Sequence, residues 1–403
     1  MTNSFIFEKY NFNKENGVLS LHYLSGGYHF EEIIAFPNAP FDADDNLIDE
    51  CVRLLHLAAG ISYYKALLPE NIEIKTSSLS KKEADFFNHF YISGLGQFAV
   101  ENNLNLQDKI NFPYAPDKKE RALNFKLEEG FFVPVGGGKD SCVTIELFKE
   151  KGIFPTLISV NSARPISDCK KASGLDEITI SRKLSPVLLN NNHLFFNGHV
   201  PITGILAFVL LLACVLYKKN EVAMSCEKSA NEGNLMQGDL SVNHQWSKSE
   251  DFEESFNDLV RPFASNFSYH SVLRSYYEID IARLFAQKCS DYFDVFTSCN
   301  KAFKIDEKNR LDRWCGCCDK CRFVFLILAP FMDKKRLVEI VGRNPLDDQE
   351  QIDGYLELLG LSGHKPFECV GTVSECRQAF DMIKDKQEWK NDFIIKELNK
   401  YVK

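Results

Sequence analysis

Short apolar runs and longer amphipathic segments alternate along the chain, a pattern typical of proteins that contain both helices and sheets. Strand-like runs occur first at 5–10, 18–23 and 30–35, separated by Asn-Gly at 16–17 and Gly-Gly at 26–27. Such tight turns predict an antiparallel meander. Helical periodicity follows at 47–59 and 81–102, and the proline-containing stretch 111–121 is expected to be a linker.

From Phe131 onward the pattern changes to strand, glycine loop and helix. Further strands are expected at 154–160, 177–180, 192–196 and 221–224. Helices between strands favour a parallel sheet with right-handed crossovers, and ligands of such sheets bind beyond the carboxyl ends of the strands. This rule predicts one crevice lined by the segments that follow three strands, 136–141, 159–161 and 225–227.

The segment 205–217 is an unbroken apolar run of 13 residues. A membrane span needs about 20 residues, so the run is expected to be a buried helix of an α/β domain. The final third of the chain has helical character, with cysteine-rich loops before about Phe323. We therefore predict three parts: an N-terminal α+β module at 1–127, a parallel-sheet nucleotide-binding domain at 128–298, and a cysteine-rich helical region at 299–403.

Composition limits the function. A formal net charge of −9 argues against a protein that mainly grips nucleic acid backbones. The chain contains thirteen cysteines, which is an odd number, and its N-terminus has no recognisable export signal. This combination indicates reduced thiols and a metal site in a cytoplasmic protein rather than a disulfide framework. We expect no nucleic acid partner and no membrane insertion, and the sequence leaves the oligomeric state open.

The run Gly136-Gly-Gly-Lys-Asp-Ser141 has the composition of a phosphate-binding loop. Glycines let the backbone approach a ligand, and the N–H groups at a helix start attract anions. Lys139 and Ser141 add donors, Asp140 is a candidate Mg²⁺ ligand, and neither Lys139 nor Asp140 is expected to be needed by the core. The run is not a Walker A loop, because the four-residue spacer between the glycines is missing. It resembles instead the SGGxDS loop of the ATP pyrophosphatases, with Gly136 in place of the first serine. The alternative is a plain glycine-rich turn.

A second motif is the cysteine cluster between residues 299 and 321. The C-x-x-C-x-x-C pattern comprises Cys315, Cys318 and Cys321, and Cys299 precedes it by sixteen residues. Four thiolates at this spacing suit a structural tetrahedral zinc site. Cys289 is the alternative fourth ligand, Cys317 is left out, and redox or iron–sulfur chemistry is the rival interpretation. A similar group occurs in 7-cyano-7-deazaguanine synthases, which also carry the pyrophosphatase loop.

Several polar runs complete the pattern. They include NGHVP at 197–201, SCEKSA at 225–230, NHQWSKS at 243–249 and HKPFECVG at 364–371. Together with the glycine loop and the cysteine cluster, these runs resemble the ATP-dependent UDP-N-acetylmuramoyl-L-alanyl-L-glutamate epimerases of the MurL type. The resemblance extends from Leu54 to Trp389. It implies inversion of the terminal L-glutamate of a nucleotide-sugar dipeptide through a glutamyl adenylate, with ATP cleaved to AMP and pyrophosphate, Mg²⁺ required, and a role in peptidoglycan precursor synthesis.

Candidate residues for such chemistry follow from their types. His199 and His244 are the first candidates for the bases, because histidine exchanges protons near neutral pH. Glu227 is a further candidate, as a base or a metal ligand. Residues expected to hold the nucleotide are Gly136, Gly137, Gly138, Lys139, Asp140, Ser141, Ser159 and Asn161. Residues expected to hold substrate carboxylates or phosphates are Asn243, Lys248, Arg274 and Lys365.

Less specific interpretations remain open at this point. His199 could cap the helix that follows it, and His244 could order its own loop. The chain could also be another adenylating enzyme of the same fold, such as a nitrile or amide former or a tRNA-modifying enzyme. A nucleotide-binding sensor without chemistry is the third possibility.

Overall fold

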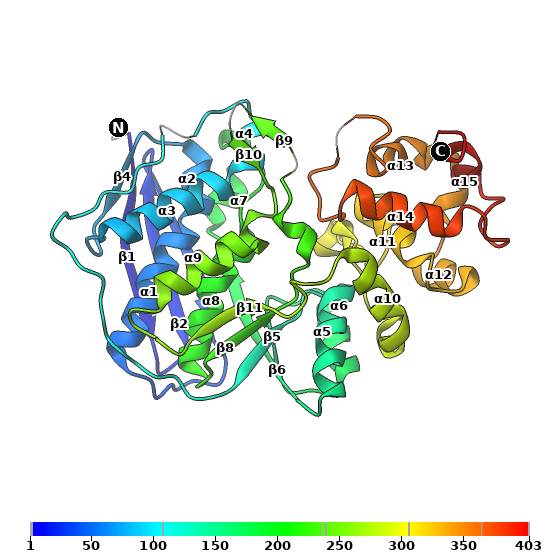
Figure 1. The fold of residues 1–403 in the computed structure, drawn as a ribbon. Helices are drawn as coiled ribbons and strands as arrows, with labels where there is room; N and C mark the ends of the chain where they lie inside the picture. The colour runs from blue at the N-terminus through cyan, green and yellow to red at the C-terminus, as the bar shows by residue number, and fades with distance from the viewer. Residues whose placement is uncertain are drawn as a thin grey trace. The chain divides into compact units, whose positions relative to one another are not determined.

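The computed structural model describes residues 3–106, 109–233, 235–237, 240–304, 307–363 and 365–401 (Figure 1). The chain divides into two compact units, each built from separate stretches. The first unit comprises 1–132, 178–223 and 235–270, and the second comprises 133–177, 224–234 and 271–403. These units are not contiguous segments, so the three-part division expected from the sequence stays a prediction.

A nine-stranded sheet has the order β11-β8-β5-β6-β7-β3-β2-β1-β4. Its strands are β1 (Ser4–Asn13), β2 (Val18–Ser25), β3 (Tyr28–Ala35), β4 (Asn71–Ile74), β5 (Phe131–Pro134), β6 (Thr156–Val160), β7 (Glu177–Lys183), β8 (Glu221–Met224) and β11 (Ser268–Ser271). Strands β1, β2 and β3 form the expected antiparallel meander, and β7 pairs antiparallel with β3. Strand β4 pairs parallel with β1, and β5 pairs parallel with β8. The protein is therefore a mixed α/β protein with a large sheet. In the first unit, β9 (Leu235–Gln237) and β10 (Leu240–Val242) form a separate two-stranded sheet.

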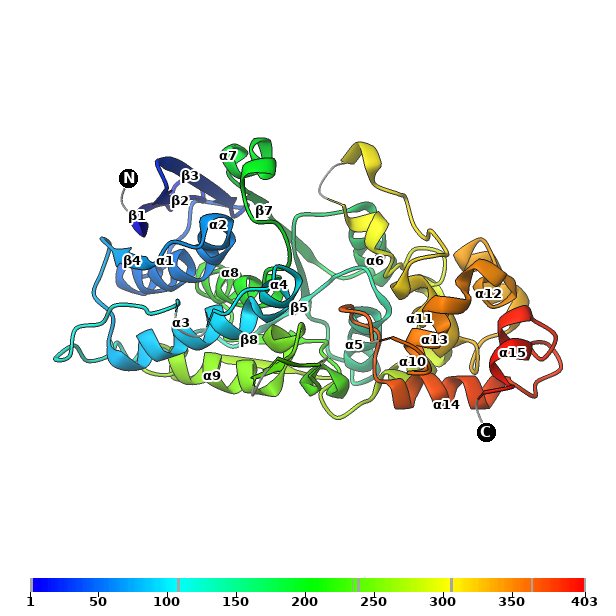
Figure 2. The ribbon, with the colours of Figure 1, turned by 90° about the horizontal axis from the view of Figure 1, so that it is seen from above.

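Helices flank the strands in both units (Figure 2). In the first unit they are α1 (Asp45–Ala59), α2 (Ile61–Leu67), α3 (Lys81–Gly94), α4 (Gly96–Glu101), α7 (Pro186–Asn190), α8 (Ile202–Leu216) and α9 (Glu250–Val260). In the second unit they are α5 (Lys139–Glu150), α6 (Arg164–Ser173), α10 (Glu278–Lys288), α11 (Asp319–Leu328), α12 (Lys334–Val341), α13 (Ile352–Leu358), α14 (Val373–Ile383) and α15 (Phe393–Leu398). The helical character expected of the final third is confirmed.

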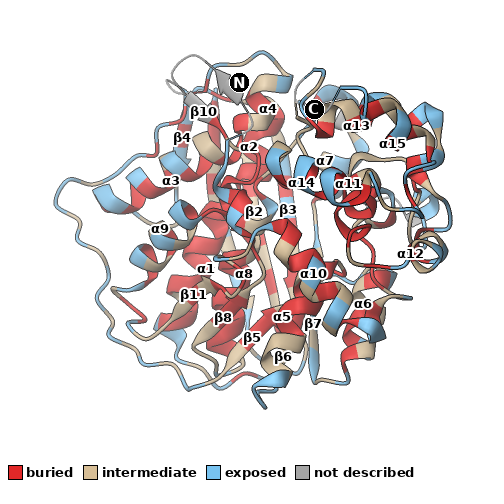
Figure 3. Ribbon diagram, turned by 45° about the vertical axis from the view of Figure 1, so that its right-hand side comes forward, coloured by how far each residue is buried: buried red, intermediate tan, exposed pale blue. Residues whose placement is uncertain are grey.

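The apolar run at 205–217 lies in helix α8, as its composition predicts. Nearly every residue of α8 is buried, and the helix packs against α1 (Figure 3). A helix that is apolar on all sides is stable only where other elements cover it completely. None of the helices in the described residues is both long and apolar enough to cross a membrane.

Helix boundaries in the first unit follow ordinary capping chemistry. The Asp44 side chain accepts the backbone N–H groups of Asn46 and Leu47 at the start of α1. Ser80 and Glu83 form a reciprocal capping box at the start of α3. Such side chains satisfy N–H groups that have no partner inside the helix.

One expectation about the elements is wrong. Residues 192–196 form no strand but a short 3₁₀ turn, Asn192–Leu194, followed by an irregular segment. The preceding asparagines favour turns, and the apolar Phe195 is buried against the rings of Tyr28 and Phe30 rather than in a sheet. The helical character expected at 81–102 is confirmed and is divided between two helices, α3 and α4, at Leu95.

Candidate functional site

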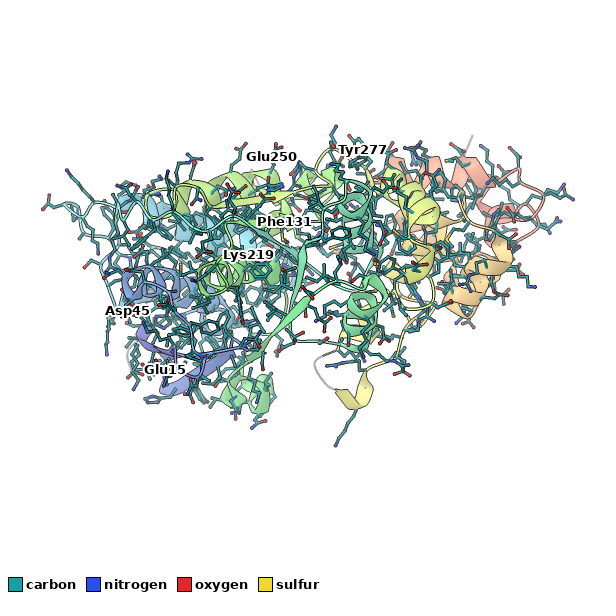
Figure 4. The ribbon with its side chains drawn as sticks, turned by 90° about the horizontal axis from the view of Figure 1, so that it is seen from below. Glu15, Asp45, Phe131, Lys219, Glu250 and Tyr277 are labelled. Carbon is teal, nitrogen blue, oxygen red and sulfur yellow. The ribbon has the colours of Figure 1, made fainter. Side chains whose placement is uncertain are left out.

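The glycine loop joins strand β5 to helix α5, as the sequence predicts; Phe131, at the start of β5, is labelled in Figure 4. Gly137 has a φ of +79°, and a Cβ atom there would approach the backbone N of Ile166 to 3.1 Å. A side chain at Gly138 would lie 3.0 Å from the Oγ atom of Ser298, whereas Gly136 faces open space. Backbone N–H groups at the start of α5 thus occupy a position suited to an anion.

Lys139 does not extend freely from this loop. Its side chain is 2% exposed and its Nζ atom donates hydrogen bonds to Asp140 and to Glu278 at the start of α10. Burial alone would lower the pKa of Lys139, but the two carboxylates outweigh it and raise the pKa above its usual value. The expectation that Lys139 is not needed by the core is therefore wrong, because its removal leaves a buried carboxylate without its partner.

Glu278 is a functional candidate that the sequence analysis did not identify. Burial raises the pKa of Glu278; Lys139 opposes this rise, while the negative charges of Asp140 and Glu227 add to it. A glutamate at the start of a helix usually stabilises the helix dipole, so no sequence signal distinguished it. Only the packing of α10 against α5 brings its carboxylate to the loop.

Glu227 lies beyond the end of β8 and is 3% exposed. Its Oε1 atom has no hydrogen-bond partner within the part of the chain that the structure describes. Arg274 donates from Nη1 to the backbone oxygen of Glu227 at 3.2 Å, so Arg274 is held at the same segment. The buried oxygen of Glu227 and the carboxylates of Asp140 and Glu278 are hard oxygen donors, which fit a magnesium ion and its nucleotide.

Ser159 lies near the end of strand β6, which adjoins β5 in the sheet, and Asn161 directly follows this strand. Ser159 is buried, and Asn161 adopts a left-handed backbone conformation with a φ of +58°. Ser141 donates from its hydroxyl to the backbone oxygen of Gly138 at 3.2 Å. The roles of these three residues in nucleotide binding stay predictions.

The cysteine cluster is formed by Cys299, Cys315, Cys318 and Cys321, whose Sγ atoms all lie within 4.8 Å of one another. Gly316 provides the turn between the ligands: its φ is +70°, and a Cβ atom there would come within 2.2 Å of Arg343. Ala302, Phe303 and Trp314 pack around the sulfurs. A donor set of four thiolates fits zinc and could hold it without an open coordination position.

The cysteine cluster is linked to the glycine loop by two hydrogen bonds that run through Thr297. The backbone N–H of Cys299 donates to Thr297 Oγ1 at 3.1 Å, and the N–H of Thr297 donates to the oxygen of Gly137 at 2.9 Å. The buried Cys169 also approaches this oxygen, with its Sγ atom at 3.6 Å. Cys289 lies elsewhere, at the end of α10, where burial and Glu146 raise the pKa of its thiol.

His199 and His244 come together in the first unit. Their ring centroids are 6.5 Å apart, and His244 is 8% exposed. Burial, reinforced by His244, Lys248 and Lys65, lowers the pKa of His199 to about 4. His199 is therefore neutral at pH 7 and can accept a proton there. Asn243 accepts the N–H of Gln245, and Gln245 accepts Lys248 Nζ at 3.4 Å, which orders the same loop.

Lys365 lines a cavity of about 530 Å³ in the second unit, together with Tyr277, Asp280 and Glu375. Figure 4 labels Tyr277, the residue that precedes α10. His364, which directly precedes Lys365 and is the first residue of the 364–371 motif, lies outside the described residues. The candidate residues thus fall into two sets: the loop, carboxylate, cavity and cysteine residues belong to the second unit, and the histidine pair with Asn243 and Lys248 belongs to the first.

Comparisons with known proteins agree with this pattern. Residues 1–272 match the family model of the MurL N-terminal domain, and residues 295–403 match that of the MurL C-terminal domain. The chain is 41% identical over 400 residues to a UDP-N-acetyl-alpha-D-muramoyl-L-alanyl-L-glutamate epimerase of Xanthomonas oryzae pv. oryzae, covering 98% of the chain and 88% of that protein. It is 37% identical to the Micromonospora protein of the same name, covering 98% of the chain and 90% of that protein. The Salinispora tropica protein of that name is 35% identical over 98% of the chain and 88% of its own length.

Proposed function

Because the chain belongs to the MurL family, we propose that it is the epimerase that inverts the terminal glutamate of UDP-N-acetylmuramoyl-L-alanyl-L-glutamate, with ATP as co-substrate. The observation that carries the proposal is the similarity of nearly the whole chain to relatives named for this reaction. We place the chemistry in an ATP pyrophosphatase fold and in the cytoplasm, where the free cysteines of this chain stay reduced. The product serves peptidoglycan precursor synthesis.

Epimerisation of a peptide's terminal glutamate requires its α-carboxylate to be activated. The α-proton is a poor acid while the adjacent carboxylate is charged, because the carbanion would place a second negative charge on the same unit. Transfer of AMP to the carboxylate removes that charge and releases pyrophosphate. The proton can then leave to one base and return from the other face, after which water releases AMP.

The second unit supplies the groups for activation. In the proposal, the N–H groups of the glycine loop and Lys139 bind the phosphates, and Asp140, Glu227 and Glu278 are the candidate ligands of Mg²⁺, which would neutralise phosphate charge. Arg274 and Lys365 are the candidate partners of substrate carboxylate or diphosphate. The cysteine cluster would hold a structural zinc ion, because four protein thiolates leave no open position for a substrate.

The first unit supplies the candidate bases. His199 is neutral at pH 7, since burial and the nearby cations lower its pKa to about 4, so its ring has a free lone pair, although the same shift makes it a weaker base than a free imidazole. His244, buried beside it, is the second candidate, and Asn243 and Lys248 are candidate substrate contacts. Glu227 remains the alternative base.

The proposal is tested by incubating the purified protein with UDP-MurNAc-L-Ala-L-Glu, ATP and Mg²⁺ and then measuring the chirality of the glutamate after acid hydrolysis. We expect D-glutamate, AMP and pyrophosphate, and no D-glutamate when ATP is replaced by a non-cleavable α,β-methylene analogue. Pyrophosphate release without inversion would favour another adenylating enzyme of this fold. No ATP turnover would favour a nucleotide sensor.

A further inference from the structure

A buried lysine lies beside the histidine pair of the first unit. Lys65, on helix α2, is 7% exposed, and its Nζ atom donates to the backbone oxygen of Phe196 at 3.2 Å. The same Nζ atom lies 5.6 Å from the ring centroid of Phe98. Phe196 is three residues before His199, so Lys65 holds the segment that carries this histidine.

The electrostatic surroundings of His199 are cationic. Burial is the largest influence on the pKa of His199, and the charges that act on it in addition are those of His244, Lys248 and Lys65, all of which lower the pKa. Near this segment, the Oε2 atom of Glu101 would lie 3.3 Å from a Cβ atom at Gly198. The other oxygen of Glu101 already accepts a hydrogen bond from Gln97.

Burying an ammonium group without an anionic partner costs free energy. Within the described residues, the Nζ atom of Lys65 contacts a backbone carbonyl and an aromatic face, which compensate the charge only in part. Burial accordingly lowers the pKa of Lys65. An anionic ligand would compensate this charge further.

We propose that Lys65, with Lys248 and the histidine pair, forms a carboxylate-binding subsite that takes the side-chain carboxylate of the substrate glutamate. The anionic character of the ligand follows from the buried ammonium group of Lys65, since His199 is neutral at pH 7. The choice of carboxylate rests on the proposed function: if the histidines act at the α-carbon, the γ-carboxylate of the same residue is the anion within a few bonds of it. The diphosphate of the nucleotide is separated from the α-carbon by a sugar and an alanine.

The experiment compares Lys65→Met, which removes the charge at similar volume, with Lys65→Arg, which keeps it. The exposed Lys81→Met, in the same unit, is the matched control. Binding of UDP-MurNAc-L-Ala-L-Glu, of the analogue ending in L-Gln, and of UDP alone is measured by calorimetry on the full-length protein without ATP. We expect the wild type to bind the Glu ligand at least about tenfold more tightly than the Gln ligand, which corresponds to about 1.4 kcal/mol.

In Lys65→Met this preference should disappear, while Lys65→Arg and Lys81→Met should retain it. UDP should bind equally to all four proteins. The free energy of unfolding of Lys65→Met should equal or exceed that of the wild type, since replacing a buried charge by an apolar side chain is often neutral or stabilising. A purely structural lysine would instead lower stability on substitution and leave the ligand preference unchanged, and that result would overturn the proposal.

Two further outcomes also count against the assignment. Loss of UDP binding in Lys65→Met would show that the subsite takes the diphosphate. To separate failure of the subsite from failure of the proposed function, the His199 resonance is titrated by NMR with and without glutarate, a dicarboxylate that needs no nucleotide site. Glutarate should raise the pKa of His199 in the wild type but not in Lys65→Met; no change in the wild type would contradict the subsite even if the enzyme proves to be an epimerase.

Discussion

At the scale of single residues, the same side chain often serves both stability and chemistry. Lys139 follows a glycine loop and was expected to interact only with a ligand, yet it is buried and paired with Glu278. Removing one partner of a buried ion pair leaves an uncompensated charge, whereas removing both can be nearly neutral. Loss of activity in a Lys139 variant therefore has two separable origins.

Lys139→Met should lower the free energy of unfolding by about 3–5 kcal/mol, because Glu278 is left buried without its cation. The double variant Lys139→Met/Glu278→Gln should recover most of this loss. Both variants should release pyrophosphate about 10²–10³ times more slowly than the wild type, since the phosphate-binding charge is gone. Urea unfolding and a pyrophosphate-release assay measure the two effects separately. Wild-type pyrophosphate release by either variant would contradict the role of the loop.

His56 allows a second test at this scale. Burial lowers its pKa to about 4, below the value of about 6.5 expected in the unfolded chain. Between these values the unfolded state binds the extra proton, so stability present at pH 7 is lost as the pH falls from 6.5 towards 4. His199 contributes in the same direction.

Replacing His56 by Gln should therefore reduce the slope of unfolding free energy against pH, by at most about 1.4 kcal/mol per pH unit. Urea unfolding at several values between pH 4.5 and 7 measures the slope. The exposed His29→Gln variant controls for the loss of a histidine as such. An unchanged slope in His56→Gln would show that His56 is not held neutral by the fold.

At the scale of elements, the local patterns of the sequence predict most strands and helices of the core. The meander, the loop between β5 and α5, the buried helix α8 and the convergence of Cys299 with Cys315, Cys318 and Cys321 follow from spacing and periodicity. Residues 192–196 show the limit of this approach, because Phe195 packs against Tyr28 and Phe30 without forming part of a strand. Glu278 and Lys65 could not be identified as site residues, since tertiary packing alone buries their charges beside other ionisable groups.

The hydrogen-bonded path from Cys299 through Thr297 to Gly137 predicts that the metal site shapes the phosphate loop. Cys321→Ser should lose bound zinc, lower the thermal unfolding midpoint and weaken ATP binding together, because binding energy of a structural metal is folding energy. Cys317→Ser, next to the cluster but outside it, should retain metal and ATP affinity. Metal content by mass spectrometry, together with binding of a fluorescent ATP analogue, distinguishes the two. Zinc retained in Cys321→Ser, or iron in the wild type, would refute the zinc assignment.

At the scale of the whole molecule, the candidate groups for two halves of one reaction belong to different compact units. The glycine loop, Lys139 and the buried carboxylates belong to the second unit, and the histidine pair belongs to the first. The sequence places these motifs in one chain but does not reveal this division, because both units are assembled from separated stretches. If the proposed roles are correct, substitutions in the two units should interrupt the reaction at different steps.

His199→Gln and His244→Gln should each still release pyrophosphate with UDP-MurNAc-L-Ala-L-Glu, because activation does not need a base at the α-carbon. Each should lose exchange of the α-proton with solvent deuterium from at least one face and should epimerise at least about 10² times more slowly, as expected for removal of a general base. Asp140→Asn, in the second unit, should abolish pyrophosphate release and exchange together. Mass spectrometry of the glutamate and a pyrophosphate assay on the same samples resolve the steps. If both histidine variants exchange and epimerise like the wild type, the bases must be sought among Cys226, Glu227 and Cys369.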